Sequence, residues 1–65
     1  MFATRTAAEY KFSFKLLSVF GKEATPADEE TATHIQFDDG KRYQVCSEQR
    51  ILEYCVSRHC REATA

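Results

Sequence analysis

The chain has 65 residues, a length that forms one small domain and buries only about 60% of the surface exposed by the unfolded chain. Its 43% hydrophobic and 29% charged residues are typical of a folded globular protein and exclude a disordered one. The net charge of −1 argues against nucleic-acid binding through bulk electrostatics, and no stretch approaches the roughly 20 apolar residues of a membrane span.

Charge is segregated along the chain. Residues 1–22 carry four basic residues and one acidic residue, a net charge of +3. Residues 23–40 carry six acidic residues and neither Lys nor Arg, a net charge of −6. Residues 41–65 carry five basic and three acidic residues, a net charge of +2. Such segregation suits orientation against a charged partner.

The first predicted element is a strand over about residues 9–19, where apolar and mostly aromatic residues alternate with polar ones. A helix is the alternative, because Thr6-Ala-Ala-Glu9 fits a capping box and Gly21 suits a helix end. The strand is favoured because the apolar residues of 7–20 spread round almost the whole helical wheel. A lone hairpin also gains stability from a third strand.

Residues 25–30 predict a short helix. Thr25 suits the N-cap and Pro26 the first helical position. The acidic residues Asp28, Glu29 and Glu30 then fall in the first turn, where the helix dipole favours negative charge.

A β-hairpin is predicted over residues 33–46, with Asp38-Asp39-Gly40 as its turn. A two-residue loop would mix apolar and polar residues on each face. A three-residue loop with Gly40 in the left-handed conformation pairs Ile35 with Tyr43 and Thr33 with Val45, which sorts the faces. One face then carries Ile35, Phe37, Tyr43 and Val45, and the other carries His34, Gln36, Arg42 and Gln44.

Residues 48–61 predict an amphipathic helix with Ser47 as its N-cap. We expect the buried face to comprise Ile51, Leu52, Cys55, Val56 and His59. The solvent face is then expected to comprise Arg50, Tyr54, Ser57, Arg58 and Arg61. Residues 62–65 are expected to fray.

The predicted fold is therefore a single α+β domain over residues 1–65, in the order strand, short helix, strand, strand, helix. The C-terminal helix packs on one face of a three-stranded antiparallel sheet.

Metal and catalytic chemistry have weak signals. Three cysteines without regular spacing do not form a disulfide framework and indicate reduced thiols in the cytoplasm. A hairpin followed by a helix resembles the outline of a small zinc finger, and Cys55 and His59 are spaced i, i+4. The hairpin lacks a C-x₂₋₄-C pair, however, and His34 and Cys46 are predicted to face away from the helix. We expect no metal, no cofactor and no enzymatic activity.

Nucleic-acid binding is one functional hypothesis. Arg50, Tyr54, Arg58 and Arg61 form a stripe on the predicted solvent face, suited to phosphate contacts and base stacking. A sheet followed by a C-terminal helix resembles the double-stranded-RNA-binding domains in topology. Residues 47–49, Ser-Glu-Gln, stand where those domains keep a lysine cluster.

Protein binding is the leading hypothesis, because a small sheet exposes its edges and the eight aromatic residues exceed what one helix can cover. The predicted contact residues are Asp28, Glu29, Glu30, Arg50, Tyr54, Arg58 and Arg61. Self-pairing at a sheet edge also predicts a homodimer. The size and the lack of a catalytic site are typical of accessory or inhibitor proteins that bacteria and phages direct against a larger host protein.

Overall fold

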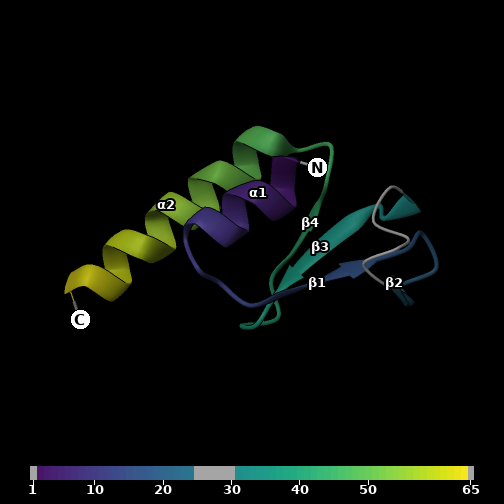
Figure 1. The fold of residues 1–65 in the computed structure, drawn as a ribbon, viewed down its shortest axis with the longest axis horizontal. Helices are drawn as coiled ribbons and strands as arrows, with labels where there is room; N and C mark the ends of the chain where they lie inside the picture. Colours follow the sequence, from purple (N-terminus) through teal and green to yellow (C-terminus); the bar gives the residue numbers. More distant parts are fainter. Residues whose placement is uncertain (1, 25–30, 65) are drawn as a thin grey trace.

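A computed structural model gives the fold of the chain and describes residues 2–24 and 31–64 (Figure 1). The elements are α1 (Phe2–Glu9), β1 (Phe14–Leu17), β2 (Glu23–Ala24), β3 (His34–Phe37), β4 (Arg42–Gln44) and α2 (Glu48–Thr64). The described strands form one antiparallel sheet in the order β2-β1-β3-β4. The predicted α+β class is confirmed. The sheet has a short fourth strand and the chain an N-terminal helix, neither of which was predicted.

The core lies between one face of the sheet and the two helices, which lie side by side (Figure 1). Ala3 and Ala7 of α1 are fully buried, and their small side chains let the helix lie close to its neighbours. From the sheet, Ile35 and Phe37 are 0% and 2% exposed, and from α2 Ile51 is 0% exposed. This shared apolar layer fixes how α2 lies over the hairpin.

The N-terminal segment corrects the predicted strand over 9–19. Within that range only Phe14–Leu17 form a strand, and the helix α1 ends at Glu9. Helix α1 ends where Lys11 adopts a positive φ of 59°. Phe12 N–H donates to Ala7 C=O at 3.1 Å and Lys11 N–H donates to Ala8 C=O at 3.0 Å, the two bonds of a Schellman helix end. This motif normally has Gly at its left-handed position, so Lys11 conceals the helix end in the sequence.

Replacing Lys11 by Gly should stabilise the protein. A non-glycine residue in the left-handed region costs about 1–2 kcal/mol, and the greater freedom of Gly in the unfolded chain offsets part of this gain. We expect Lys11→Gly to raise the free energy of unfolding by about 0.5–1 kcal/mol, measured by urea denaturation. Lys15→Gly is the matched control and should destabilise, because Lys15 lies in β1. A loss of stability in Lys11→Gly would contradict the assigned helix end.

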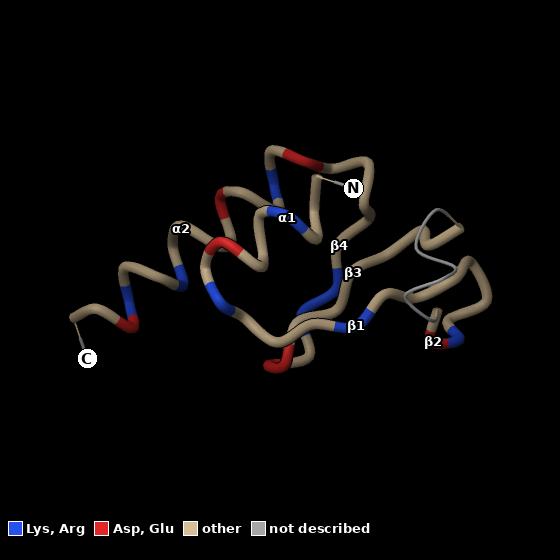
Figure 2. The backbone as a smooth tube through the Cα atoms, viewed as in Figure 1, with Lys and Arg blue, Asp and Glu red and all other residues tan. Residues whose placement is uncertain are grey.

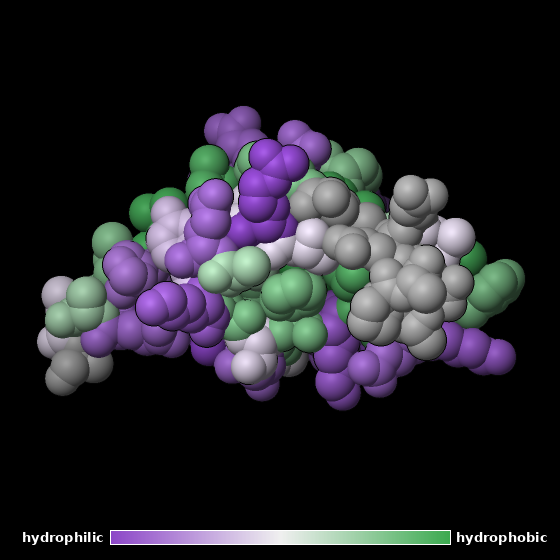
Figure 3. Space-filling model, viewed as in Figure 1, coloured by the Kyte–Doolittle hydropathy of each residue, from purple (hydrophilic) through white to green (hydrophobic). Residues whose placement is uncertain are grey.

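Gly21 does not end a helix, as the alternative reading of this segment required. It has a φ of 76° in the turn between β1 and β2, where its N–H donates to Ser18 C=O at 2.9 Å. Val19 and Phe20 lie in this turn and are 68% and 85% exposed. Figure 3 shows apolar atoms at the end of the molecule that carries this turn.

The predicted hairpin is confirmed, including its register. Ile35 pairs with Tyr43, and Phe37 N–H donates to Lys41 C=O at 2.9 Å across a three-residue loop. Gly40 has a φ of 87°, the left-handed conformation that the loop requires. At the other end, Val45 N–H donates to Thr33 C=O at 3.0 Å.

Helix α2 begins as predicted and ends later. Ser47 precedes its first residue, and the Ser47 carbonyl accepts a hydrogen bond from Ile51 N–H at 3.1 Å. The helix runs to Thr64, so residues 62–64 are helical and extend three residues beyond the predicted end at Arg61. The short helix predicted over residues 25–30 lies outside the described residues.

Candidate functional site

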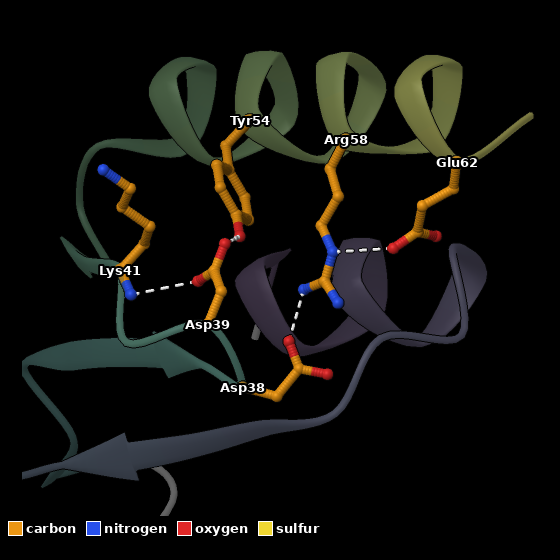
Figure 4. Close-up of polar contacts among 6 residues, drawn as sticks. All are labelled: Asp38, Asp39, Lys41, Tyr54, Arg58 and Glu62. Atoms are coloured by element: carbon orange, nitrogen blue, oxygen red, sulfur yellow. Dashed lines mark hydrogen bonds and ion pairs between the residues drawn. The ribbon is translucent and has the colours of Figure 1, made fainter. Parts of the chain in front are cut away.

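A polar cluster joins the hairpin turn to α2 (Figure 4). The Tyr54 hydroxyl donates a hydrogen bond to Asp39 Oδ2, and the other oxygen of Asp39 accepts from Lys41 N–H at 3.0 Å. The Arg58 Nη1 atom lies 2.6 Å from Asp38 Oδ1, and Arg58 Nε donates to Glu62 Oε1 at 3.0 Å. Both carboxylates of the acidic turn are therefore bound to the helix.

Aromatic packing encloses the same side chains. The Tyr54 ring lies 4.5 Å from the Phe37 ring and 5.2 Å from the Tyr43 ring, measured between centroids. The Arg58 guanidinium carbon lies 4.3 Å from the centroid of Phe12, a distance at which a cation is attracted to the ring face. Tyr54 is 8% exposed and the Arg58 side chain 16% exposed, so both belong to the structure of the domain.

The predicted solvent face of α2 is therefore wrong at two of its residues. Tyr54 and Arg58 were expected to be exposed because a helical wheel classes both residues as polar and places them opposite the apolar face. Each instead buries its ring or aliphatic stem and directs its polar end to the acidic turn. Leu52 and Val56, predicted to be buried, are 40% and 42% exposed. His59, predicted on that same buried face, is also exposed.

The hydrogen bonds of the cluster shift its pKa values. The Arg58 guanidinium lowers the pKa of Asp38 below its ordinary value, and the Tyr54 hydroxyl does the same for Asp39. Burial, together with the bond to Asp39, raises the pKa of Tyr54 to about 12. The hydrogen-bonded ion pair with Asp38 raises the pKa of Arg58.

These shifts predict a stability plateau with two edges. A lowered folded-state pKa gives stability that is lost as pH falls, so the contribution of Asp38 and Asp39 disappears below their ordinary pKa of 3.8. A raised pKa gives stability that is lost as pH rises, so the contribution of Tyr54 disappears between pH 10.0 and about 12. Urea unfolding across pH would measure both edges.

Tyr54→Phe isolates the alkaline edge. This variant should lose about 1 kcal/mol at neutral pH, the usual value of one hydrogen bond. Its free energy of unfolding should also fall less steeply than that of the parent protein as pH rises from 10.0 to about 12, because the variant has no hydroxyl to ionise. An alkaline decline that is the same in Tyr54→Phe and the parent protein would show that Tyr54 does not contribute to it.

The remaining predicted contact residues have different outcomes. Arg50 and Arg61 are exposed, as expected. Asp28, Glu29 and Glu30 lie outside the described residues.

A shallow groove runs between β4 and α2 and brings Arg50 and Arg61 to one surface. It encloses about 410 Å³. Lys41 adds a third cation and Glu53 is the one carboxylate among the described lining residues, which are Lys41, Tyr43, Arg50, Glu53, Tyr54, Ser57 and Arg61. Glu53 accepts a hydrogen bond from Gln49 Nε2 at 3.3 Å. The groove therefore carries a net positive charge.

A second groove lies on the far side of β4, against the sheet face opposite α1 and α2. It encloses about 560 Å³, and Arg50 and Tyr43 line both grooves. Arg42, His34 and Gln44 line it from the sheet, and Val19 from the β1–β2 turn. We call the surface formed by Lys41, Arg42, Arg50 and Arg61 the cationic surface. Figure 2 shows its basic segment on β4 beside the acidic turn.

Lys41 and Arg42 were missing from the predicted site. The sequence held a signal for them, because alternation along 41–45 places these two cations on opposite faces of a strand. What it did not show is that β4 is an edge strand and that Arg50 of α2 lies beside it.

The three cysteines are not joined by disulfides. Cys46, Cys55 and Cys60 all have free thiols, and burial raises the pKa of Cys55, which makes this thiol a poorer nucleophile. Within residues 2–24 and 31–64, no three His, Cys, Asp or Glu side chains are grouped so as to hold a metal ion.

Among the described helices, none has the length and apolar character needed to cross a membrane. Comparison with known proteins gave no match, either to a family model, to a curated protein or to a solved structure. The candidate site therefore depends on the geometry of this chain alone.

Proposed function

We propose that this chain is a non-enzymatic protein-binding module whose cationic surface binds an acidic segment of a larger protein. The observation that carries the proposal is the position of Lys41, Arg42, Arg50 and Arg61 along two grooves that share an edge strand. Charge of one sign along a groove attracts and orients a partner of the opposite sign. A role as a bacterial or phage accessory or inhibitor protein fits this mode of action.

Nucleic-acid binding is less well supported in the form predicted from the sequence. That form needs Tyr54 to stack on a base and Arg58 to meet a phosphate. The Tyr54 ring packs against Phe37, and the Arg58 guanidinium is paired with Asp38 and Glu62. Exposed apolar residues such as Val19, which lines one groove, suit a protein partner better than a phosphate backbone.

We also propose a compartment for the module. The free state of Cys46, Cys55 and Cys60 supports a reducing compartment, and we place the module in the cytoplasm.

A differential capture experiment tests the proposal. The tagged protein and its charge-reversed variant Arg50→Glu/Arg61→Glu are used to capture partners from an extract of the source cells after nuclease treatment. The matched control is Arg5→Glu/Lys11→Glu, which makes the same change in net charge at exposed residues that line neither groove. We expect the control to retain one protein that the groove variant loses.

A protein captured equally by both variants would place the binding site elsewhere. If partners are captured from an untreated extract and none is captured from the nuclease-treated extract, the nucleic-acid hypothesis would be favoured. Circular dichroism of each variant establishes that the fold is intact.

A further inference from the structure

The free edge of β4 indicates how a partner binds. Resting on the proposed function, we infer that the partner's acidic segment binds in an extended conformation and pairs with β4 as an additional strand of the sheet. Strand addition of this kind takes its affinity from main-chain hydrogen bonds and its specificity from alternate side chains.

The hydrogen-bond phase of the hairpin leaves the outer edge of β4 open. The pairs Thr33–Val45 and Phe37–Lys41 are hydrogen-bonded, and the pair Ile35–Tyr43 lies between them in the same phase. In an antiparallel ladder the alternate residues direct their N–H and C=O groups outward. Arg42 and Gln44 therefore point their main-chain groups away from β3.

Three of these outward groups have no bond within the described residues. They are the N–H and C=O of Arg42 and the N–H of Gln44. The Gln44 carbonyl accepts a hydrogen bond from Ser47 N–H at 2.9 Å, at the start of α2. Strand addition therefore has room for one full residue pair at Arg42 and a further donor at Gln44.

The two grooves suit the side chains of such a strand. Successive residues of a strand point to opposite faces of the sheet, so a strand beside β4 directs its side chains alternately into the two grooves. Lys41, Arg50 and Arg61 line the groove on the helix face. Arg42 and Arg50 line the groove on the open face. Both grooves therefore favour carboxylates.

The same cations explain why the occupant is not a second copy of this chain. Arg42 is the β4 residue with both outward main-chain groups open, so two β4 strands would pair antiparallel with Arg42 of one copy opposite Arg42 of the other. Like charges directly opposite each other in a strand pair are destabilising. Basic residues on an edge strand are also a common defence against indiscriminate pairing. An acidic strand can still pair with such an edge, because its charge is opposite to that of Lys41 and Arg42. We therefore do not propose β4 as the edge through which the predicted homodimer would form.

The other end of the sheet is a poorer edge. β2 has two residues and begins with Glu23, so it offers few main-chain groups and repels an acidic strand. Strand addition is therefore assigned to β4.

The test uses a fluorescein-labelled synthetic peptide of alternating Glu and Thr and measures its binding by fluorescence anisotropy at low salt. Gln44→Pro removes the outward N–H of Gln44, which no hydrogen bond among the described residues uses, and proline is tolerated at such edge positions. Gln44→Thr is the matched control. We expect Gln44→Pro to bind about tenfold more weakly than Gln44→Thr, as the loss of one main-chain hydrogen bond predicts.

Arg50→Glu/Arg61→Glu separates the two proposals. Loss of binding in this variant, with equal affinity in Gln44→Pro and Gln44→Thr, would leave the cationic surface as the site and overturn strand addition. Absence of peptide binding to the parent protein would also overturn strand addition. The proposed function would then be tested by the capture experiment alone. Tighter binding of a single-stranded oligonucleotide, insensitive to Gln44→Pro, would overturn both. Thermal melting of Gln44→Pro checks that the variant is folded.

Discussion

Phe37→Ala should unfold a large part of the protein population. Phe37 is 2% exposed, and its ring contacts those of Phe12, Tyr43 and Tyr54 at centroid distances of 6.4, 6.1 and 4.5 Å. Truncation of a buried phenylalanine costs about 3–5 kcal/mol, which is comparable to the whole stability of a domain this small. The free energy of unfolding, measured in urea, should fall by this amount.

The chain supplies a matched control for this substitution. Phe20 is 85% exposed in the β1–β2 turn, so Phe20→Ala should change the free energy of unfolding by less than about 0.5 kcal/mol. A cost below about 1 kcal/mol for Phe37→Ala would show that the aromatic cluster is not the core and that the hairpin lies in another register.

Arg58→Ala should have the second largest effect. The substitution removes the contact with the Phe12 ring, the two ion pairs and the packed stem of a side chain that is 16% exposed. We expect a loss of about 2 kcal/mol, of which the packing of the stem contributes a large share. Thermal and urea unfolding would measure it.

Arg61→Ala is the control for Arg58→Ala, because Arg61 lies on the same helix and is exposed. It should leave stability nearly unchanged. Arg58→Met separates packing from charge, because it keeps much of the stem and removes the guanidinium. Equal stability of Arg58→Ala and Arg61→Ala would show that the polar cluster does not hold the hairpin turn against α2.

The sequence was most informative where structure is local. The hairpin follows from alternation and from a turn that needs Gly40 at positive φ, and both signals lie within fourteen residues. The register could therefore be predicted, since only one loop length separates apolar from polar residues.

Sequence patterns were less informative where tertiary contacts decide which side chains are buried. Tyr54 and Arg58 face the hairpin turn, where they bind Asp39 and Asp38, two residues that are far from them in sequence. A helical wheel treats Tyr54 and Arg58 as polar, whereas the fold buries their apolar portions. The end of α1 was hidden because Lys11 holds a conformation in which Gly is expected.

The sequence predicted that basic residues would form the candidate site, but it identified only some of those residues. Basic residues of α2 were expected to contact a partner, and Arg50 and Arg61 remain in the site. Lys41 and Arg42 join them because the order of the strands leaves β4 at the edge of the sheet, and strand order cannot be read from alternation alone.

The most direct measurement of the central claim is a titration of the ¹⁵N-labelled protein with the Glu-Thr peptide, followed by the chemical shifts of its amide groups. Binding at the cationic surface predicts that the largest changes fall on β4 and on the residues of α2 near Arg50. Arg42 and Gln44 should show the largest changes of all. Changes centred on Leu52 and Val56, on the opposite side of α2 from the groove, or on the turn that carries Phe20, would contradict it.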